Sequence, residues 1–265
     1  MAERQPPVAT RFRTIEVEQQ APVCTITLNK PPLNIIDMEM MAELSSVLGR
    51  VEESGSGVRV LVLRGAGKAF SAGVSIQEHT PDLIRQMIPR FHDLFRRLAR
   101  TDRITIAAVH GSCLGGGFEL VSMCDLVLAA DTAQFGQPEI KLGQLPPVGV
   151  ILLPYLAGYR KAAELVFSGA SIGASEAQAL GLVNRVVPQA QLTQALDAML
   201  RELLAHSGSA LRLTKQILRR IAAPDFERAL DASERFFLDV IAATEDAKEG
   251  IFAFLEKRPP RWRNS

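Results

Sequence analysis

The hydrophobic positions of this chain follow two periods, and the period predicts the type of each element. Short apolar or β-rich runs bounded by polar or turn-forming residues predict buried strands at residues 23–28, 58–63, 104–109, 126–130 and 183–187. Apolar residues at helical spacing predict helices at residues 38–51, 81–100, 116–123, 159–167, 175–180, 191–205, 210–222 and 226–256. Strands therefore alternate with helices in the first part of the chain, and helices alone follow.

This order of elements indicates an α/β protein. Short strands separated by helices favour parallel pairing, and periodicity taken alone predicts a doubly wound sheet. The change to helices falls near Pro188, which divides the chain into residues 1–188 and 189–265. No linker or low-complexity segment separates these parts, so we expect them to act as one unit.

Composition and charge exclude several classes of protein. The 265 residues are 47% hydrophobic and 22% charged, as in a globular protein, and the net charge of +1 gives no general attraction to nucleic acid or membranes. No apolar stretch reaches the ~20 residues of a membrane span, and residues 1–13 lack the apolar core of a signal peptide. The three cysteines are odd in number and widely spaced, which predicts buried thiols in a reducing, cytoplasmic setting and no metal site.

Three motifs carry the candidate chemistry. They are Ala-Phe-Ser-Ala-Gly-Val at 69–74, Gly-Gly-Gly-Phe-Glu at 115–119 and Phe-Gly-Gln-Pro-Glu at 135–139. A glycine-rich turn that opens a helix directs backbone N–H groups toward a developing negative charge. Two nearby carboxylates, Glu119 and Glu139, could hold and activate a water molecule. Together these features indicate acid–base chemistry on a carbonyl compound whose oxygen becomes negative.

The two glutamates stand among apolar neighbours, although a single glutamate is usually a solvated surface residue. Burial raises the pKa of a carboxyl group, and a second carboxylate raises one of the pair further. Glu119 and Glu139 are therefore expected to titrate as a coupled pair, with one of them protonated near neutral pH.

The three motifs, in this order and spacing, resemble those of the crotonase (enoyl-CoA hydratase/isomerase) superfamily. The resemblance extends from about residue 23 to residue 258. It implies a crotonase-like spiral of ββα units over residues 1–188 and a helical C-terminal region that trimerises over residues 189–265. It also implies a homotrimer or hexamer, and no cofactor other than the coenzyme A of the substrate thioester.

The resemblance also implies roles for individual residues. The backbone N–H groups of Val74 and Gly116 would form an oxyanion hole, although a glycine run can equally be a tight turn with a packing role. Glu119 would orient or deprotonate water, and Glu139 would exchange the proton with the substrate carbon.

The same resemblance implies a binding region for coenzyme A. The adenine would lie near Ala72, Ser75 and Ile76. Lys257 and Arg258 would contact phosphates, and a solvated basic tail is an equal alternative for these two residues.

Two departures from the hydratase pattern bear on the substrate. Pro147 stands where that pattern has a glycine whose N–H helps to hold the catalytic water, and proline has no N–H. Ser75 stands where aspartate is frequent. These features look more like cyclic dienoyl-CoA hydratases, which hydrate cyclohexa-1,5-diene-1-carbonyl-CoA in anaerobic aromatic degradation.

Other interpretations stay open. A double-bond isomerase needs one well-placed carboxylate, and a non-catalytic crotonase relative that binds RNA would need a basic helix that the sequence does not show. His79 is either an acid–base group or a residue before a helix capped by Thr80. Cys113 is a candidate nucleophile with no histidine nearby except His110.

Overall fold

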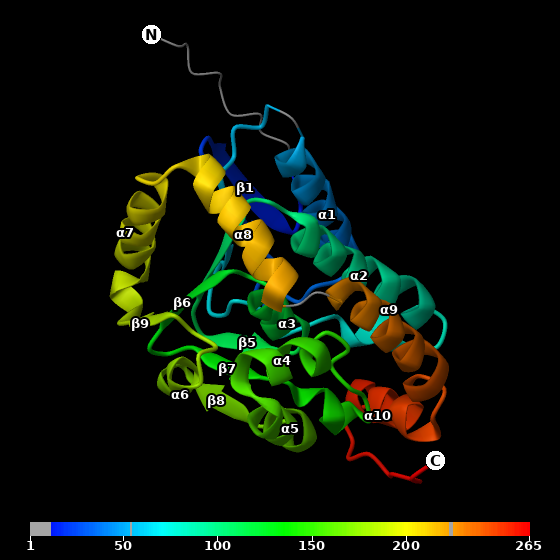
Figure 1. The fold of residues 1–265 in the computed structure, drawn as a ribbon. Helices are drawn as coiled ribbons and strands as arrows, with labels where there is room; N and C mark the ends of the chain where they lie inside the picture. Colours follow the sequence, from blue (N-terminus) through cyan, green and yellow to red (C-terminus); the bar gives the residue numbers. More distant parts are fainter. Residues whose placement is uncertain (1–11, 54, 223–224) are drawn as a thin grey trace.

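The larger of two β-sheets forms the centre of the protein (Figure 1). The computed structural model describes residues 12–53, 55–222 and 225–265. In strand order, this sheet contains β1 (Ile15–Gln20), β2 (Val23–Leu28), β3 (Val60–Gly65), β4 (Ile104–Val109), β6 (Leu126–Ala130) and β9 (Arg185–Val187). β1 pairs with β2 in antiparallel fashion, and the other neighbours are parallel.

The smaller sheet decides the topology. It consists of β5 (Ser112–Leu114), β7 (Gln134–Gly136) and β8 (Ser171–Gly173), with β5 parallel and β8 antiparallel to β7. β5 follows directly on β4, and β7 follows directly on β6, so the chain passes from one sheet to the other in successive turns. The spiral of ββα units is therefore confirmed, and the doubly wound sheet expected from periodicity alone is wrong.

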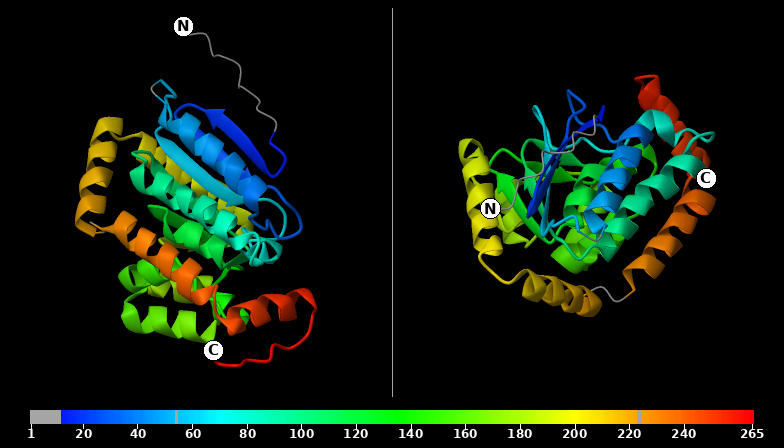
Figure 2. Two further views of the ribbon diagram at one scale, coloured as in Figure 1. Left: turned by 90° about the vertical axis from the view of Figure 1, so that its right-hand side faces the viewer. Right: turned by 90° about the horizontal axis from the view of Figure 1, so that it is seen from above.

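Helices enclose both sheets. Those of the first part are α1 (Met38–Glu52), α2 (Ile84–Arg100), α3 (Gly116–Ser122), α4 (Gly149–Ala157), α5 (Tyr159–Ser168) and α6 (Ala174–Ala179), with short 3₁₀ helices η1 (Ile76–His79), η2 (Pro138–Leu142) and η3 (Gln189–Gln191). The later helices are α7 (Leu192–Leu204), α8 (Gly208–Ala222), α9 (Phe226–Phe236) and α10 (Glu245–Leu255). Figure 2 shows α7, α8 and α9 following one another around the outside of the core.

The larger sheet is buried on both faces, as parallel sheets usually are. Leu61 and Leu63 of β3 belong to the main apolar core, which also contains the buried face of α2. Val60 and Val62 of the same strand point to the opposite face and pack in a second cluster with residues of α7. This alternation explains why β3 reads as a continuous apolar run.

Some predicted boundaries differ from the structure. α2 begins at Ile84, and Thr80 does not cap it with its side chain; the Thr80 carbonyl accepts the N–H groups of Leu83 and Ile84. The helix expected over residues 226–256 is interrupted by a π-helical turn, Phe237–Ile241, and the side chain of Thr244 caps the start of α10. Apolar residues such as Leu238, Val240 and Ile241 continue through the π-helical turn, so periodicity did not reveal it.

Three other expectations concern the chain as a whole. None of the described helices is both long and apolar enough to cross a membrane. The sequence predicts that residues 1–13 lack the apolar core of a signal peptide, and residues 1–11 of this segment lie outside the described residues. All three cysteines are free thiols: Cys24 and Cys113 are buried, and Cys124 is half-buried.

Candidate active site

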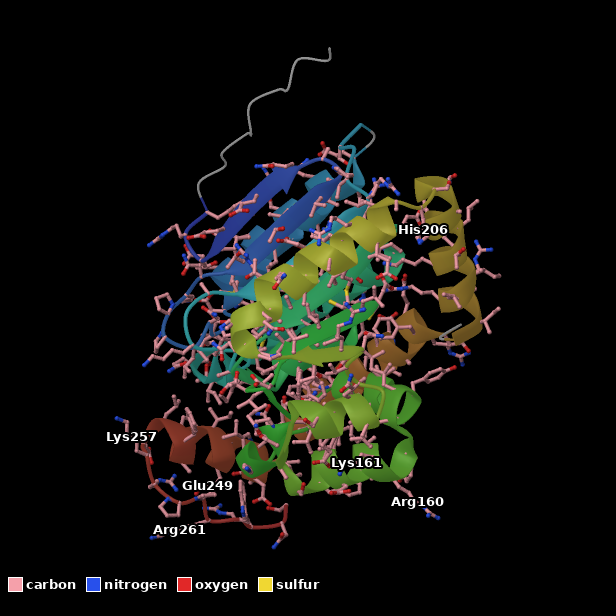
Figure 3. All side chains as sticks on the ribbon, turned by 90° about the vertical axis from the view of Figure 1, so that its left-hand side faces the viewer. Arg160, Lys161, His206, Glu249, Lys257 and Arg261 are labelled. Atoms are coloured by element: carbon pink, nitrogen blue, oxygen red, sulfur yellow. The ribbon has the colours of Figure 1, made fainter. Side chains whose placement is uncertain are left out.

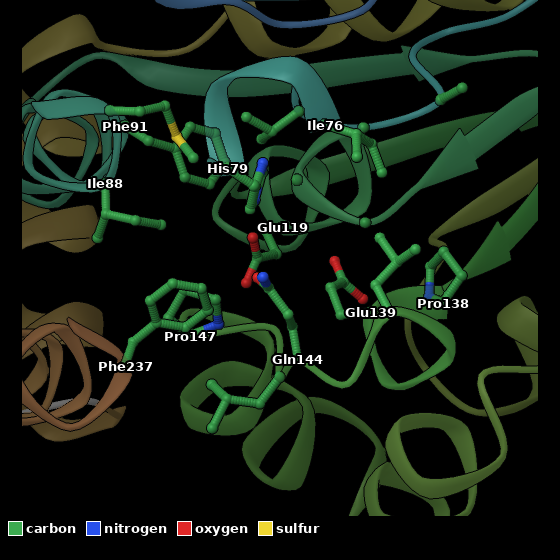
Figure 4. Close-up of a pocket in the computed structure, with 18 residues that line it drawn as sticks. Ile76, His79, Ile88, Phe91, Glu119, Pro138, Glu139, Gln144, Pro147 and Phe237 are labelled. Atoms are coloured by element: carbon green, nitrogen blue, oxygen red, sulfur yellow. The ribbon is translucent and has the colours of Figure 1, made fainter. Parts of the chain in front are cut away.

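A cavity of about 70 Å³ lies where the three sequence motifs meet (Figure 4). A site this large has room for several water molecules, since one water needs about 10–15 Å³ on this measure. Its lining includes six of the residues singled out in the sequence: Ala72, Val74, Ile76, Gly116, Glu119 and Glu139.

The segment that carries Val74 is held between two others. On one side, Ser71 N–H donates to the Ser112 carbonyl at 3.1 Å, and Leu114 N–H donates to the Ser71 carbonyl at 2.9 Å. On the other side, Ile36 bridges Gly73 and Ser75 through its own N–H and carbonyl, which leaves the N–H of Val74 directed away from Ile36. The Val74 N–H finds no protein acceptor among the described residues.

Gly116 opens α3 and lies beside this segment. A Cβ atom on Gly73 would lie 3.8 Å from the Gly116 nitrogen, so the two backbones are in close approach. A Cβ atom on Gly116 would clash with the side chain of Val74 and lie 2.8 Å from Phe91 Cζ, which explains the requirement for glycine. As the first residue of a helix, Gly116 has an N–H without an intrahelical partner, and none of the described residues accepts it.

Glu119 lies in the first turn of α3 and is 2% exposed. Its Oε1 atom accepts the N–H groups of Val148 and Gly149, both at 2.7 Å, where the chain enters α4. Burial raises the pKa of Glu119 to about 7, although the two N–H groups favour the charged form and oppose that rise. Its second oxygen, Oε2, has no hydrogen-bond partner among the described residues.

Glu139 reaches the same cavity from the smaller sheet. β7 pairs with β5, and Gly115 N–H donates to the Gly136 carbonyl at 2.9 Å, which brings the start of η2 beside Gly115. With its amide nitrogen turned toward Glu139, Gln137 donates to both carboxylate oxygens at 3.1 Å. Burial, followed by the charge of Glu119, raises the pKa of Glu139 well above its usual range.

The remaining walls of the cavity are mostly apolar. α2 contributes Met87, Ile88 and Phe91, and the π-helical turn contributes Phe237. His79 also lines the cavity, but its Nδ1–H donates to the Ser75 carbonyl at 2.8 Å. Burial lowers the pKa of His79, so the ring is neutral near pH 7.

Three of the predicted binding residues lie outside the cavity lining. Ser75 is buried and its hydroxyl donates to Gln77 Oε1 at 3.2 Å. Lys257 is exposed beyond the C-terminal end of α10 (Figure 3), and the guanidinium of Arg258 pairs with Glu249, with Nη2 2.9 Å from Oε2. Within one chain, the structure does not bring Lys257 and Arg258 to the cavity that holds Glu119 and Glu139.

The candidate nucleophile Cys113 also lies outside the cavity lining. Its side chain is fully buried, and burial raises the pKa of the Cys113 thiol well above its usual range. A buried thiol held in its neutral form is a poor nucleophile.

Three residues of the site escaped the sequence analysis: Gln137, Gln144 and Phe237. Gln137 stands within the third motif, so its position beside Glu139 could have been anticipated. No local pattern distinguishes a glutamine that faces a cavity from a solvated one, and nothing in the C-terminal helical pattern marks Phe237 as a residue of a site formed by the first part of the chain.

The arrangement can perform acid–base chemistry in a largely apolar pocket. The pKa of Glu119 is raised to about 7 and that of Glu139 well above its usual range, so one proton is shared unequally by the pair. Two backbone N–H groups without protein acceptors face the same space.

Comparison with known proteins agrees with this geometry. Residues 18–265 match the enoyl-CoA hydratase/isomerase family. A cyclohexa-1,5-dienecarbonyl-CoA hydratase of Thauera aromatica is 35% identical over 94% of this chain and 95% of its own length. A probable enoyl-CoA hydratase of Mycobacterium bovis is 38% identical over 95% of this chain and 98% of its own.

Solved structures show the same relationship. An enoyl-CoA hydratase from Mycobacterium avium subsp. paratuberculosis has a TM-score of 0.86 at 26% identity and covers 95% of this chain and 99% of its own. A carnitinyl-CoA hydratase from Mycobacterium avium has a TM-score of 0.83 at 30% identity, with coverages of 97% and 100%. The family match and the relatives, each spanning nearly the whole chain, place this protein in the enoyl-CoA hydratase/isomerase family, the crotonase superfamily.

Proposed function

We propose that this protein is a hydro-lyase that adds water across a double bond conjugated with the thioester carbonyl of an acyl-CoA. The observation that carries the proposal is the pair Glu119 and Glu139, which face one cavity with very different proton affinities. Relatives named as enoyl-CoA hydratases support the reaction class. An isomerase needs one carboxylate, whereas addition of water uses both a base and an acid.

The thioester oxygen would bind between the N–H groups of Val74 and Gly116. As the nucleophile adds to the β-carbon, negative charge moves onto this oxygen, and preorganised N–H groups stabilise it more than they stabilise the neutral carbonyl. Gly116 lies at the start of α3, where the helix dipole adds a favourable potential.

The two glutamates complete the proton balance. Ionised Glu119 accepts a proton from water through its free Oε2 while the water oxygen bonds to the β-carbon. Protonated Glu139 then gives its proton to the α-carbon of the enolate. One water molecule is consumed, and transfer of the new proton from Glu119 to Glu139 restores the starting state.

For the substrate, we propose a cyclic dienoyl-CoA. Pro147 and apolar residues from α2 and the π-helical turn line the cavity, and one relative is named cyclohexa-1,5-dienecarbonyl-CoA hydratase. With such a diene the proton would enter at the far end of the conjugated system. Ordinary enoyl-CoA hydratases are equally similar in sequence, so linear enoyl-CoA is the competing substrate.

A ratio of specificity constants tests this choice. Loss of the enoyl thioester absorbance gives kcat/KM for cyclohexa-1,5-diene-1-carbonyl-CoA and for crotonyl-CoA. We expect the cyclic diene to be preferred, with residual linear activity, because pocket shape is worth only about 1–3 kcal/mol per methylene. Preference for crotonyl-CoA would show that the protein is a hydratase of linear enoyl-CoA. Absence of hydration with both substrates would refute the proposed function.

For coenzyme A, we propose that Ala72, Ser75 and Ile76 receive the adenine. Lys257 and Arg258 would contact phosphates, and their distance from the cavity lining favours a role at a site shared with a second copy of the chain. Replacing Lys257 with Ala should raise KM with little change in kcat. A KM equal to that of the unaltered protein would assign Lys257 to a solvated tail.

We also propose a homotrimer or hexamer. Large apolar side chains are exposed on α4, α5 and α8, among them Tyr155, Phe167 and Ile221. Such faces favour burial against further copies. Analytical ultracentrifugation should give three or six times the mass of one chain, and a monomer would refute this assembly.

A further inference from the structure

The side-chain amide of Gln144 has no hydrogen-bond partner among the described residues, although Gln144 is 5% exposed and lines the cavity. Figure 4 shows its amide end pointing into the cavity toward the carboxylate of Glu119, with Glu139 on its other side. The amide is accessible from the cavity, so it can hydrogen-bond a polar ligand that enters there.

The neighbouring turn cannot supply the missing donor. Positions 146 and 147 are prolines without N–H groups, and the N–H groups of Val148 and Gly149 are both occupied by Glu119 Oε1. The amide of Gln137 is directed at Glu139. Among the described glutamines that border the two carboxylates, Gln144 is thus the one with N–H groups to offer.

A water molecule poised for attack needs a third contact. Its two hydrogens can be donated to acceptors such as Glu119 Oε2, and one lone pair must face the substrate carbon. The other lone pair can accept an N–H, and this contact fixes the direction of attack. A neutral amide suits this role because it adds no charge beside two carboxyl groups of raised pKa.

We propose that Gln144 is a catalytic residue whose side-chain N–H donates to the attacking water and orients it between Glu119 and the substrate. This inference rests on the proposed hydration reaction. It assigns to a side chain the water contact that a turn with prolines at positions 146 and 147 cannot make.

The first test replaces Gln144 with Met, which keeps the length of the side chain and removes its polar atoms. With crotonyl-CoA and cyclohexa-1,5-diene-1-carbonyl-CoA, we expect kcat to fall about 10- to 100-fold, the value of one hydrogen bond, while KM stays nearly constant. Gln86→Met is the matched control, because Gln86 is an exposed glutamine of α2 and should behave as the unaltered protein. An unchanged kcat for Gln144→Met, or a rise in KM alone, would overturn the inference.

A second measurement separates water binding from damage to the site. Exchange of an α-hydrogen of butyryl-CoA in D₂O needs the oxyanion hole and the ionised form of Glu139 as the base, but no attacking water, and mass spectrometry reads it directly. Gln144→Met should retain this exchange while it loses hydration. Equal loss of both reactions would show a general structural role and would contradict the proposal.

The third arm restores a donor to the turn. Adding Pro147→Gly to Gln144→Met provides a backbone N–H at position 147, and we expect it to recover part of the lost kcat. Failure of this rescue would mean that Gln144 does not act as a donor to water. If the unaltered protein hydrates neither substrate, the proposed function itself fails, whereas hydration unaffected by Gln144→Met removes only this inference.

Discussion

The two walls of the cavity hold chemically identical carboxyl groups in different ways. On one wall, the backbone N–H groups of Val148 and Gly149, at the start of α4, donate to Glu119 Oε1, both at 2.7 Å. On the other wall, Glu139 receives a longer contact of 3.1 Å from the flexible side chain of Gln137. The first arrangement is rigid and favours the charged carboxylate, and the second favours it much less.

The difference shows that burial alone does not decide which group carries the proton. Glu119 is only 2% exposed, yet it has the lower pKa of the two, about 7. Hydrogen bonds from fixed amides offset part of the cost of burying its charge. The backbone amide that favours the charged form of Glu139 is its own, and Glu139 is also close to the charge of Glu119, so its pKa rises further.

The largest expected effect comes from removing either carboxylate. Glu119→Gln and Glu139→Gln should each lower kcat roughly 10²- to 10⁴-fold, the usual contribution of a general acid or base. Hydration assays with circular dichroism as a check on folding measure this effect. Turnover like that of the unaltered protein in either variant would remove that glutamate from the mechanism.

The next effect concerns the oxyanion hole proposed at the N–H groups of Val74 and Gly116. Gly116→Pro removes the N–H and should lower kcat on the order of 10²- to 10³-fold. Gly116→Ala is the matched control, because it introduces the same Cβ clash with Val74 and Phe91 while keeping the N–H. If the two variants lose the same activity, the loss comes from the clash and the Gly116 N–H has no catalytic role.

The pH profile of kcat/KM tests the proton assignment directly. Activity needs ionised Glu119, so the rate should fall about tenfold per pH unit below pH 7, its approximate pKa. It also needs protonated Glu139, so a second decline should follow on the alkaline side, well above the usual range of a glutamate carboxyl group. Residual activity of Glu119→Gln should lose the acidic decline, and a profile that still falls below pH 7 would contradict the assignment.

The smallest effect should come from the hydrogen bond that holds the turn beside Glu119. Ser233 of α9 donates its hydroxyl to the Pro147 carbonyl at 2.7 Å, beside the N–H groups that hold Glu119. Ser233→Ala should lower the free energy of unfolding by about 1 kcal/mol and kcat a few-fold, because the turn becomes less rigid. Ser45 of α1 donates a hydrogen bond to Asp93 of α2, away from this turn. Ser45→Ala should therefore lower the free energy of unfolding without lowering kcat.

The main sheet was largely predictable from the sequence. β2, β4 and β6 have the bounds that their apolar or β-rich runs predict, because buried strands are rich in apolar and β-branched residues. The motifs also placed Val74, Gly116, Glu119 and Glu139, and all four line one cavity.

The tertiary structure alone decided the rest. β5, β7 and β8 span three residues each, too few for any period, yet their pairing turns a doubly wound sheet into a spiral and brings Glu139 beside Gly115. The proton affinity of Glu119 depends on amides 29 and 30 residues away. The side-chain amide of Gln144 gains its proposed role only because Glu119, Glu139 and Pro147 line the same cavity. The sequence by itself determined which groups could react; long-range contacts decided their charge, because pKa depends on everything packed around a group and not on its neighbours along the chain.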